Sequence, residues 1–318
     1  MQRQARCLIL GGCGFIGSNL AEKLLALDYR VRVFDMPTAS RIHLVPVESD
    51  IEFFVGNFLN DEDVDGAVQG VDFVFHLIGT TLPANSNSRP IFDVESNVLA
   101  TIRLLQSSVR HRVKRIIFSS SGGTVYGEPQ TIPILEDHRT DPICSYGITK
   151  LTVEKYLQLF HHLYGLDYTI LRIGNPYGKY QKVTAEQGIV GVFLSHINQG
   201  KTITIWGDGS VTRDYIYVGD VAEAFVAALK QDSPYRIFNV GTGVGISVRD
   251  LLRKMERITG IQPHLEYESG RPIDVSINVL DSTRAQKCMN WRAEIDCDEG
   301  LRRTWAWICE SKANIATG

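Results

Sequence analysis

The sequence predicts an α/β fold in which a doubly wound parallel sheet carries a smaller, interleaved C-terminal α/β domain. First, short apolar runs alternate with helical patterns through the first half of the chain, as in parallel βαβ units. Second, a glycine-rich loop at residues 11–17 separates the first run from the first helical pattern. Third, Tyr146 and Lys150 have the spacing that puts two side chains on one helix face.

The elements of the first half follow in regular order. Strands are expected at residues 6–10, 30–34, 51–55, 71–77, 114–119 and 167–172. Helices are expected between them at residues 15–27, 90–108 and 146–164. On the first of these, Leu20, Leu24 and Leu27 recur at helical spacing. Strands joined by such helical crossovers form a doubly wound, Rossmann-type sheet.

The rhythm changes after Asn175-Pro176-Tyr177-Gly178. Helices are expected at 189–198 and 221–229, short extended segments at 203–206 and 215–217, and a strand at 236–240 that rejoins the main sheet. We therefore expect a first domain over residues 1–175, to which 212–260 partly return, and a second domain mainly over 176–318.

Composition argues against several classes of protein. The net charge of -3 gives no field that would attract nucleic acid or an anionic membrane. No stretch reaches the roughly 20 apolar residues of a membrane helix. The basic start of the chain runs through Cys7-Leu8-Ile9-Leu10 straight into glycines, unlike a secretory signal. Six cysteines without a C-x-x-C pair favour a reducing cytoplasm, and no metal site is predicted.

The glycine loop predicts a dinucleotide site. It follows a strand, opens a helix and satisfies G-x-G-x-x-G, so backbone N–H groups can approach a pyrophosphate. Asp35 ends the second strand about 20 residues later, where its carboxylate can bind ribose hydroxyls and repel a 2′-phosphate. This favours NAD over NADP, although Arg32 and Arg41 lie nearby; Arg32 is expected to point away. The predicted contacts of the loop are Gly11, Gly14, Phe15, Ile16 and Gly17.

Tyr146 and Lys150 predict acid–base chemistry on an alcohol. An ammonium beside the phenol would favour phenolate and make it a base near neutral pH. A surface pair on a helix is the alternative interpretation. A serine-rich segment, residues 119–121, supplies a hydroxyl at the carboxyl end of a buried strand, where ligands bind in open sheets. His76 is expected to be a packed strand-end histidine rather than a proton donor.

These motifs, in this order, resemble the extended short-chain dehydrogenase/reductase family. Within it the chain is most similar to NAD-dependent nucleotide-sugar epimerases of the UDP-glucose (UDP-galactose) 4-epimerase type, over almost its whole length. The resemblance rests on residues 11–17, Asp35, Asn97, residues 119–127, Tyr146, Lys150, Asn175-Pro176-Tyr177-Gly178, Gly207-Asp208-Gly209 before Arg213-Asp214-Tyr215, and Gly270-Arg271-Pro272 with Asp274.

The resemblance implies a role for each matching residue. Tyr146 takes the proton of a sugar 4-hydroxyl, and Lys150 supports the phenolate. Because Gly122 stands at the usual helper position, Ser121 is taken as the helper hydroxyl, with Ser120 and Thr124 in reserve. Further cofactor contacts are Asn57, where an aspartate is common, and Phe58, Leu77, Asn97 and Lys150. Further substrate contacts are Ser120, Thr124, Tyr146, Asn175, Arg213, Arg271, Asp274 and Asn278. A homodimer through helices 90–108 and 146–164 is also implied.

Departures from related enzymes narrow the expected reaction to 4-epimerisation of a UDP-hexose. Gly123 and Thr124 replace the Asp-Glu pair of the 4,6-dehydratases, and the glutamate of the UDP-glucuronate decarboxylases is missing. Asn278 replaces a bulky tyrosine of glucose-restricted epimerases, so UDP-N-acetylhexosamine is expected to fit beside UDP-glucose, UDP-galactose or UDP-glucuronate. The alternatives are an NAD(P)-dependent 4-ketoreductase and a non-catalytic NAD-binding scaffold.

Overall fold

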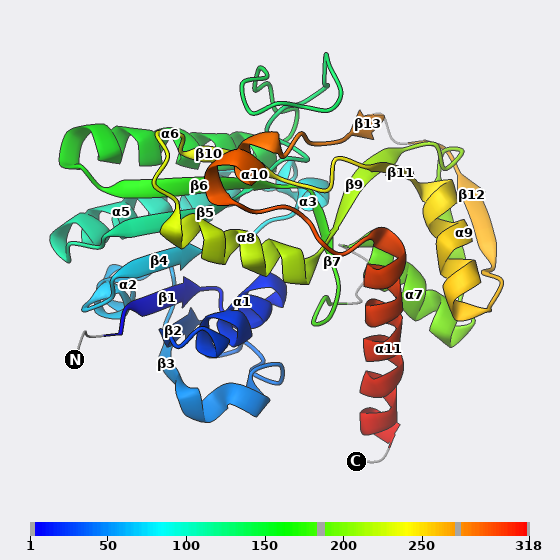
Figure 1. Cartoon of the computed structure of the whole chain (residues 1–318), viewed down its shortest axis with the longest axis horizontal. Coiled ribbons are helices and arrows are strands. Elements are labelled where there is room, and N and C mark those ends of the chain that lie inside the picture. The colour runs from blue at the N-terminus through cyan, green and yellow to red at the C-terminus, as the bar shows by residue number, and fades with distance from the viewer. Residues whose placement is uncertain (1–3, 183–187, 271–274, 317–318) are drawn as a thin grey trace.

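The computed structural model describes residues 4–182, 188–270 and 275–316. Its main element is a parallel seven-stranded sheet with the order β10-β6-β5-β4-β1-β2-β3 (Figure 1). The strands are β1 (Arg6–Leu10), β2 (Arg30–Asp35), β3 (Ile51–Val55), β4 (Phe73–His76), β5 (Arg115–Ser121), β6 (Asp167–Ile173) and β10 (Ile237–Val240). The predicted doubly wound sheet is confirmed, and so is the return of the late strand.

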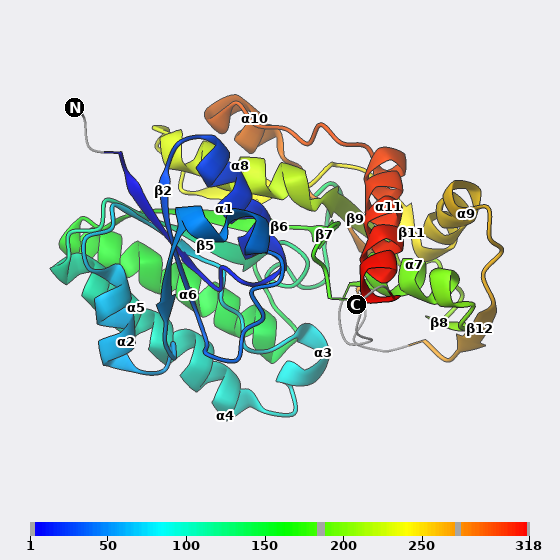
Figure 2. The same ribbon diagram turned by 90° about the horizontal axis from the view of Figure 1, so that it is seen from below.

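Helices cover both faces of this sheet (Figure 2). On one face lie α1 (Phe15–Ala26), α8 (Val218–Lys230) and α10 (Thr283–Met289). On the other lie α2 (Asp61–Val68), α5 (Ala100–Arg110) and α6 (Ser145–Tyr164). Strand β1 shows why: Cys7 and Ile9 belong to the core under α1 and α8, whereas Leu8 and Leu10 belong to the core under α2, α5 and α6. Because helices cover both faces of the sheet, successive residues of each strand must be apolar, as the near-continuous apolar runs of the sequence show.

The segment that the sequence predicted as one helix over residues 90–108 has three parts. It begins with α4 (Pro90–Asp93), continues as a π-helical stretch over Val94–Leu99 and ends as α5. A π-helical stretch inserts an extra residue per turn and is often found at functional sites. Within this stretch Ser96 and Val98 are buried, whereas Val94 and Leu99 are exposed, so apolar spacing did not reveal it.

A smaller region packs beside the sheet (Figures 1 and 2). One sheet there has the strand order β11 (Gly245–Ser247), β9 (Thr212–Tyr217), β13 (Ile277–Asn278), and β7 (Asn175–Tyr177) also pairs with β9. Strands β8 (Ile203–Trp206) and β12 (Leu265–Glu268) form a parallel pair. Helices α7 (Ile189–Gln199), α9 (Val248–Thr259) and α11 (Cys297–Ala316) complete the region. Short helices also span Val45–Asp50 and Pro83–Ser86, the latter being α3.

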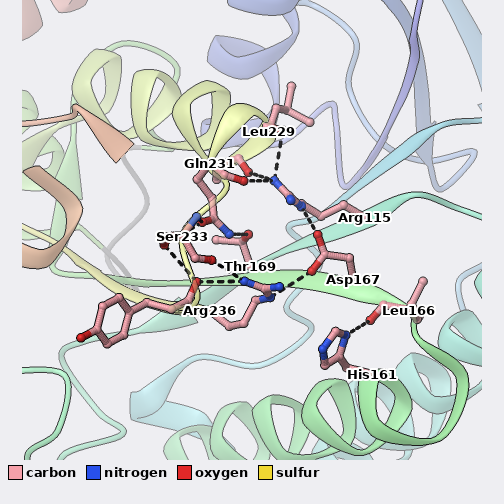
Figure 3. A network of polar contacts seen from close by, with 11 residues as sticks. Arg115, His161, Leu166, Asp167, Thr169, Leu229, Gln231, Ser233 and Arg236 are labelled. Atoms are coloured by element: carbon pink, nitrogen blue, oxygen red, sulfur yellow. Dashed lines mark hydrogen bonds and ion pairs between the residues drawn. The ribbon is translucent and has the colours of Figure 1, made fainter. Parts of the chain in front are cut away.

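At the amino end of the sheet a polar network joins strands to α8 (Figure 3). Arg115 binds Asp167 at 2.6 Å and donates to the carbonyls of Ala228, Leu229 and Gln231 at the end of α8. It therefore satisfies carbonyls that the helix terminus leaves open. In the part of the chain that the structure describes, no helix has the length and apolar character needed to cross a membrane.

Candidate active site

The glycine loop after β1 forms a cradle at the carboxyl edge of the sheet. A Cβ on Gly12 would lie 2.7 Å from a Val33 methyl, and one on Gly17 would collide with the Gly11 carbonyl oxygen. Gly11 has a φ of +82°, which favours glycine. No side chain among the described residues caps the first turn of α1, which also contains no acidic residue. Its free N–H groups and dipole suit a pyrophosphate.

Asp35 lies at the end of β2 beside this loop. Its carboxylate accepts hydrogen bonds from the backbone N–H groups of Cys13 and Met36, each at 2.9 Å. Arg32 is buried on the other side of the strand, where it binds the Ala67 and Gln69 carbonyls and Glu52. Arg41 stacks on the ring of Phe53, with its guanidinium carbon 4.4 Å from the centroid. The prediction that Arg32 points away from the loop is confirmed.

Tyr146 lies in the first turn of α6, which α3 holds in place. The Tyr146 N–H donates to Ser86 Oγ at 3.1 Å, and the Ser145 N–H donates to Asn87 Oδ1 at 2.8 Å. Burial raises the pKa of Tyr146 to about 12, with smaller contributions from Cys144 and Asp93. The expected lowering of this pKa by Lys150 is not found, because desolvation dominates.

Lys150 is buried one turn further along α6, between β4 and β5. Its ammonium donates to the Ser119 carbonyl at 2.8 Å and lies 4.8 Å from the Phe118 ring centroid and 5.6 Å from that of Tyr146. A Cβ on Gly79 would be 3.9 Å from the ammonium nitrogen, an ordinary van der Waals distance, so the segment after β4 lies directly beside the lysine. Burial lowers the pKa of Lys150 to about 8, against the raising effects of Asp93 and Glu154.

The hydroxyls at the serine-rich end of β5 alternate between the two faces of the sheet. Ser120 is buried, and its hydroxyl donates to Glu154 at 2.5 Å. Glu154 in turn forms a buried ion pair with Arg172 at 2.6 Å. Ser121, one position on, is half-buried and begins the turn to Thr124. The Ser120 hydroxyl therefore already has a partner in a structural network, and its contact with substrate stays a prediction.

Thr124 packs against the start of α6. A Cβ on Gly147, the residue after Tyr146, would lie 2.8 Å from the Thr124 carbonyl oxygen and 3.2 Å from Thr124 Cβ. The turn from Ser121 to Thr124 therefore adjoins the helix that carries the tyrosine. The geometry keeps both Ser121 and Thr124 as candidates for the helper hydroxyl.

The residues predicted to contact the cofactor outside the glycine loop differ in how deeply they are buried. Phe58 is buried with its ring 5.2 Å from that of His76. Asn57 is exposed, and its side chain accepts from the Leu59 N–H. Leu77 is half-buried against the core under α1. His76 bonds Thr101 at 2.8 Å, and burial lowers its pKa to about 3. It is thus the packed strand-end histidine that the sequence predicted, and its low pKa keeps it neutral.

Three of the predicted substrate residues, Asn175, Arg213 and Asn278, lie on the strands of the smaller region. Asn175 on β7 donates to the Asp214 carbonyl at 3.4 Å. Arg213 on β9 stands in register with Asn278 on β13. Asn278 is buried and donates to the Gly122 carbonyl at 3.0 Å, while its Oδ1 has no hydrogen-bond partner among the described residues. Arg271 and Asp274 fall outside the described residues.

Two buried carboxylates were missed by sequence reasoning. Asp214 accepts from Thr242, Gly243 and Leu280 and so ties β9 to two loops. Asp93, at the end of α4, is fully buried beneath the first turn of α6. An acidic residue inside an amphipathic pattern gives no sequence signal of burial, because such residues are mostly exposed.

Comparisons with known proteins agree with this geometry. Residues 7–241 match the model of the NAD dependent epimerase/dehydratase family. A putative UDP-glucose 4-epimerase from Methanocaldococcus jannaschii is 35% identical over 303 residues, 95% of this chain and 97% of that relative. The UDP-glucose 4-epimerase of Thermotoga maritima, crystallised with UDP-glucose, has a TM-score of 0.92 at 33% identity and covers 96% of this chain and 99% of its own.

A second solved structure is the UDP-N-acetylglucosamine 4-epimerase of Methanobrevibacter ruminantium, in complex with UDP-N-acetylmuramic acid. Its TM-score is 0.91 at 28% identity, and the match covers 98% of this chain and 100% of that one. Similarity thus extends over both the main sheet and the smaller region.

Proposed function

The chain belongs to the NAD-dependent epimerase/dehydratase family, and we propose that it is an NAD-dependent UDP-hexose 4-epimerase. The observation that carries this proposal is the placement of Tyr146 and Lys150. Both lie on one face of α6, with the lysine ammonium against the carboxyl end of β5, and the glycine cradle follows β1 at the same edge of the sheet. A base for an alcohol and a dinucleotide cradle at one edge suit reversible oxidation of a sugar hydroxyl.

The residues at the cradle fit NAD. The uncapped first turn of α1 would receive the pyrophosphate, and the Asp35 carboxylate would receive the adenosine ribose hydroxyls. Neither neighbouring arginine is placed for a 2′-phosphate, since Arg32 is buried elsewhere and Arg41 stacks on Phe53. When bound, NAD supplies a hydride acceptor and donor and a positive charge near Tyr146.

In this reaction Tyr146 removes the proton from the sugar 4-hydroxyl and later returns it. With a pKa of about 12, only about one Tyr146 in 10⁵ is phenolate at pH 7. The Lys150 ammonium and the cofactor charge must together lower this pKa before the base can act. We assign Ser121 as the helper hydroxyl and Thr124 as its reserve. The 4-keto sugar would rotate within the site, so that the opposite face of its C4 carbonyl receives the hydride.

Sugar recognition is assigned to the smaller region. Asn175 and Arg213 would contact the diphosphate, as planar guanidinium and amide groups suit phosphate oxygens. Asn278 would leave room for a 2-acetamido group, and its unpartnered Oδ1 could accept from the acetamido N–H. We therefore propose that UDP-N-acetylhexosamine is used as well as UDP-glucose. Equal rates for wild type and Asn278→Tyr on UDP-N-acetylglucosamine would refute this assignment.

We further propose residues 1–175 as the cofactor domain and 176–318 mainly as the substrate domain. All six cysteines are free thiols, which supports a reducing, cytoplasmic location.

A homodimer through α6 and the helix before it completes the proposal. Ile148, Leu159 and Leu163 leave 52%, 42% and 55% of their surfaces exposed on α6, and Leu99 at the end of the π-helical stretch leaves 44%. A second copy of the chain would cover this apolar stripe. Light scattering on wild type and Leu159→Glu tests it: the wild type is expected to have twice the mass of the variant.

NMR of purified protein with UDP-glucose, UDP-N-acetylglucosamine or UDP-glucuronate, without reduced cofactor, tests the reaction. Appearance of the 4-epimer with the diphosphate intact is expected. No epimer from any of the three, with NAD bound, would favour a 4-ketoreductase instead.

A further inference from the structure

A buried carboxylate beneath the active-site helix has no place in the reaction described so far. Asp93 is the last residue of α4, its relative exposure is 0%, and it is separated from solvent by α6 and the segment after β4. No ion pair to Asp93 is found among the described residues; side-chain hydroxyls and an amide satisfy it instead. A carboxylate buried without a cation is costly, and it persists where several donors hold it.

The donors come from both sides of the site. From α6, Ser145 Oγ donates to one carboxylate oxygen at 2.6 Å. Thr149 Oγ1 lies 3.4 Å from the other oxygen and shares its one proton with the nearer Tyr146 carbonyl at 2.9 Å. From the segment after β4, Thr81 Oγ1 donates at 2.6 Å. From the π-helical stretch, Asn97 Nδ2 donates at 2.8 Å. The two α6 donors are the residues immediately before Tyr146 and immediately before Lys150.

We propose that Asp93 is a positioning residue, which locks the first turn of α6 to Thr81 and Asn97 and sets the charge around Tyr146 and Lys150. This inference rests on the proposed epimerase function. The carboxylate also lies at the amino end of α6, where negative charge is stabilised by the helix dipole. One carboxylate thus joins, at a single point, the helix turn that carries Tyr146 and Lys150 and the side chain of Asn97, a predicted cofactor contact.

The charge of Asp93 acts on both members of the pair in the same direction. It raises the pKa of Tyr146 and that of Lys150. The other groups that act on the pair are Cys144 before α6, Glu154 on α6, which is paired with Arg172, and His76 on β4, which burial keeps neutral. Asp93 is therefore the shared charge that acts on both groups, so its removal should lower both pKa values together.

The test compares Asp93→Asn with Glu95→Gln, which removes the same charge from an exposed position two residues away. For Asp93→Asn, both limbs of the pH profile of kcat/KM should move to lower pH by roughly half a unit or more. Its kcat should fall on the order of tenfold or more, while KM for the UDP-sugar changes little. Glu95→Gln should match the wild type. An unshifted profile in Asp93→Asn, or an equal shift in both variants, would overturn the proposal.

Two further measurements keep the outcome clear. Ser145→Ala retains the charge of Asp93 but loses one hydrogen bond to it, so kcat should fall while the limbs of the pH profile stay in place. A wild-type kcat in both Ser145→Ala and Thr149→Val would refute the anchoring role. Tyrosinate absorbance of nucleotide-loaded protein, taken as the difference from the matching Tyr146→Phe chain, reports the Tyr146 pKa without turnover. That titration still tests Asp93 if no sugar is epimerised, so failure of the proposed function is recognised separately.

Discussion

Replacing Lys150 with methionine should make the cofactor-free protein more stable while abolishing its activity. The folded chain buries the Lys150 ammonium, and its pKa falls from 10.5 to about 8. The unfolded chain therefore binds this proton more tightly than the folded one, and the difference opposes folding at pH values below 8. Methionine has similar length and carries no charge.

The magnitude follows from the shift. A gap of about 2.5 units at 1.36 kcal/mol each corresponds to about 3 kcal/mol of destabilisation at neutral pH. Loss of the hydrogen bond to the Ser119 carbonyl would take back about 1 kcal/mol, so a net gain of about 2 kcal/mol is expected at pH 7. Because the cost disappears as the unfolded chain also loses the proton, the gain should shrink steadily between pH 8 and 10.5.

Urea unfolding of nucleotide-free protein at pH 7, 8.5 and 10 measures the free energy of unfolding for wild type and Lys150→Met. Lys155→Met serves as the control, because Lys155 is exposed on the same helix, and its effect should stay within about 0.5 kcal/mol. A Lys150→Met chain that is less stable than wild type at pH 7, or a difference that does not change with pH, would refute the electrostatic reasoning.

Three other predictions concern the base, the cradle and the buried ion pair. Tyr146→Phe should lower kcat by about 10²- to 10⁴-fold with nucleotide affinity retained, since only the proton acceptor is lost; rapid-quench turnover and calorimetric titration with UDP check this. Gly17→Ala should abolish NAD binding, because the new methyl meets the Gly11 carbonyl, and fluorescence titration with NADH should show no saturable signal. Glu154→Ala should destabilise the fold by about 3–5 kcal/mol, because it leaves Arg172 buried without its partner; a loss under 1 kcal/mol in urea would contradict this.

Much of the fold could be predicted because the strands are buried on both faces. Their continuous apolar runs, the glycines of the loop and the carboxylate of Asp35 all belong to short stretches of chain, and each has one physical explanation. The return of β10 to the main sheet was also predicted. Helix α2 was missed, because Asp61, Glu62 and Asp63 at its start leave few apolar residues to mark a face.

The site was harder to predict, because its geometry depends on contacts between distant segments. Alternation along β5 decides which serine faces Glu154, and no single-residue rule gives the register of a strand end. The pKa of Tyr146 depends on desolvation by its surroundings, which the Tyr-x-x-x-Lys spacing does not contain. Asp93 is recognised only when the segment after β4, α4 and α6 are seen together.

Isotope retention tests the central claim most directly. UDP-glucose carrying deuterium at C4 would be incubated with the NAD-loaded protein in H₂O, and the product would be analysed by NMR and mass spectrometry. The account predicts UDP-galactose that still carries the deuterium at C4, because the hydride leaves and returns within one site. Loss of the label to solvent, or release of a 4-keto sugar in place of the epimer, would contradict it.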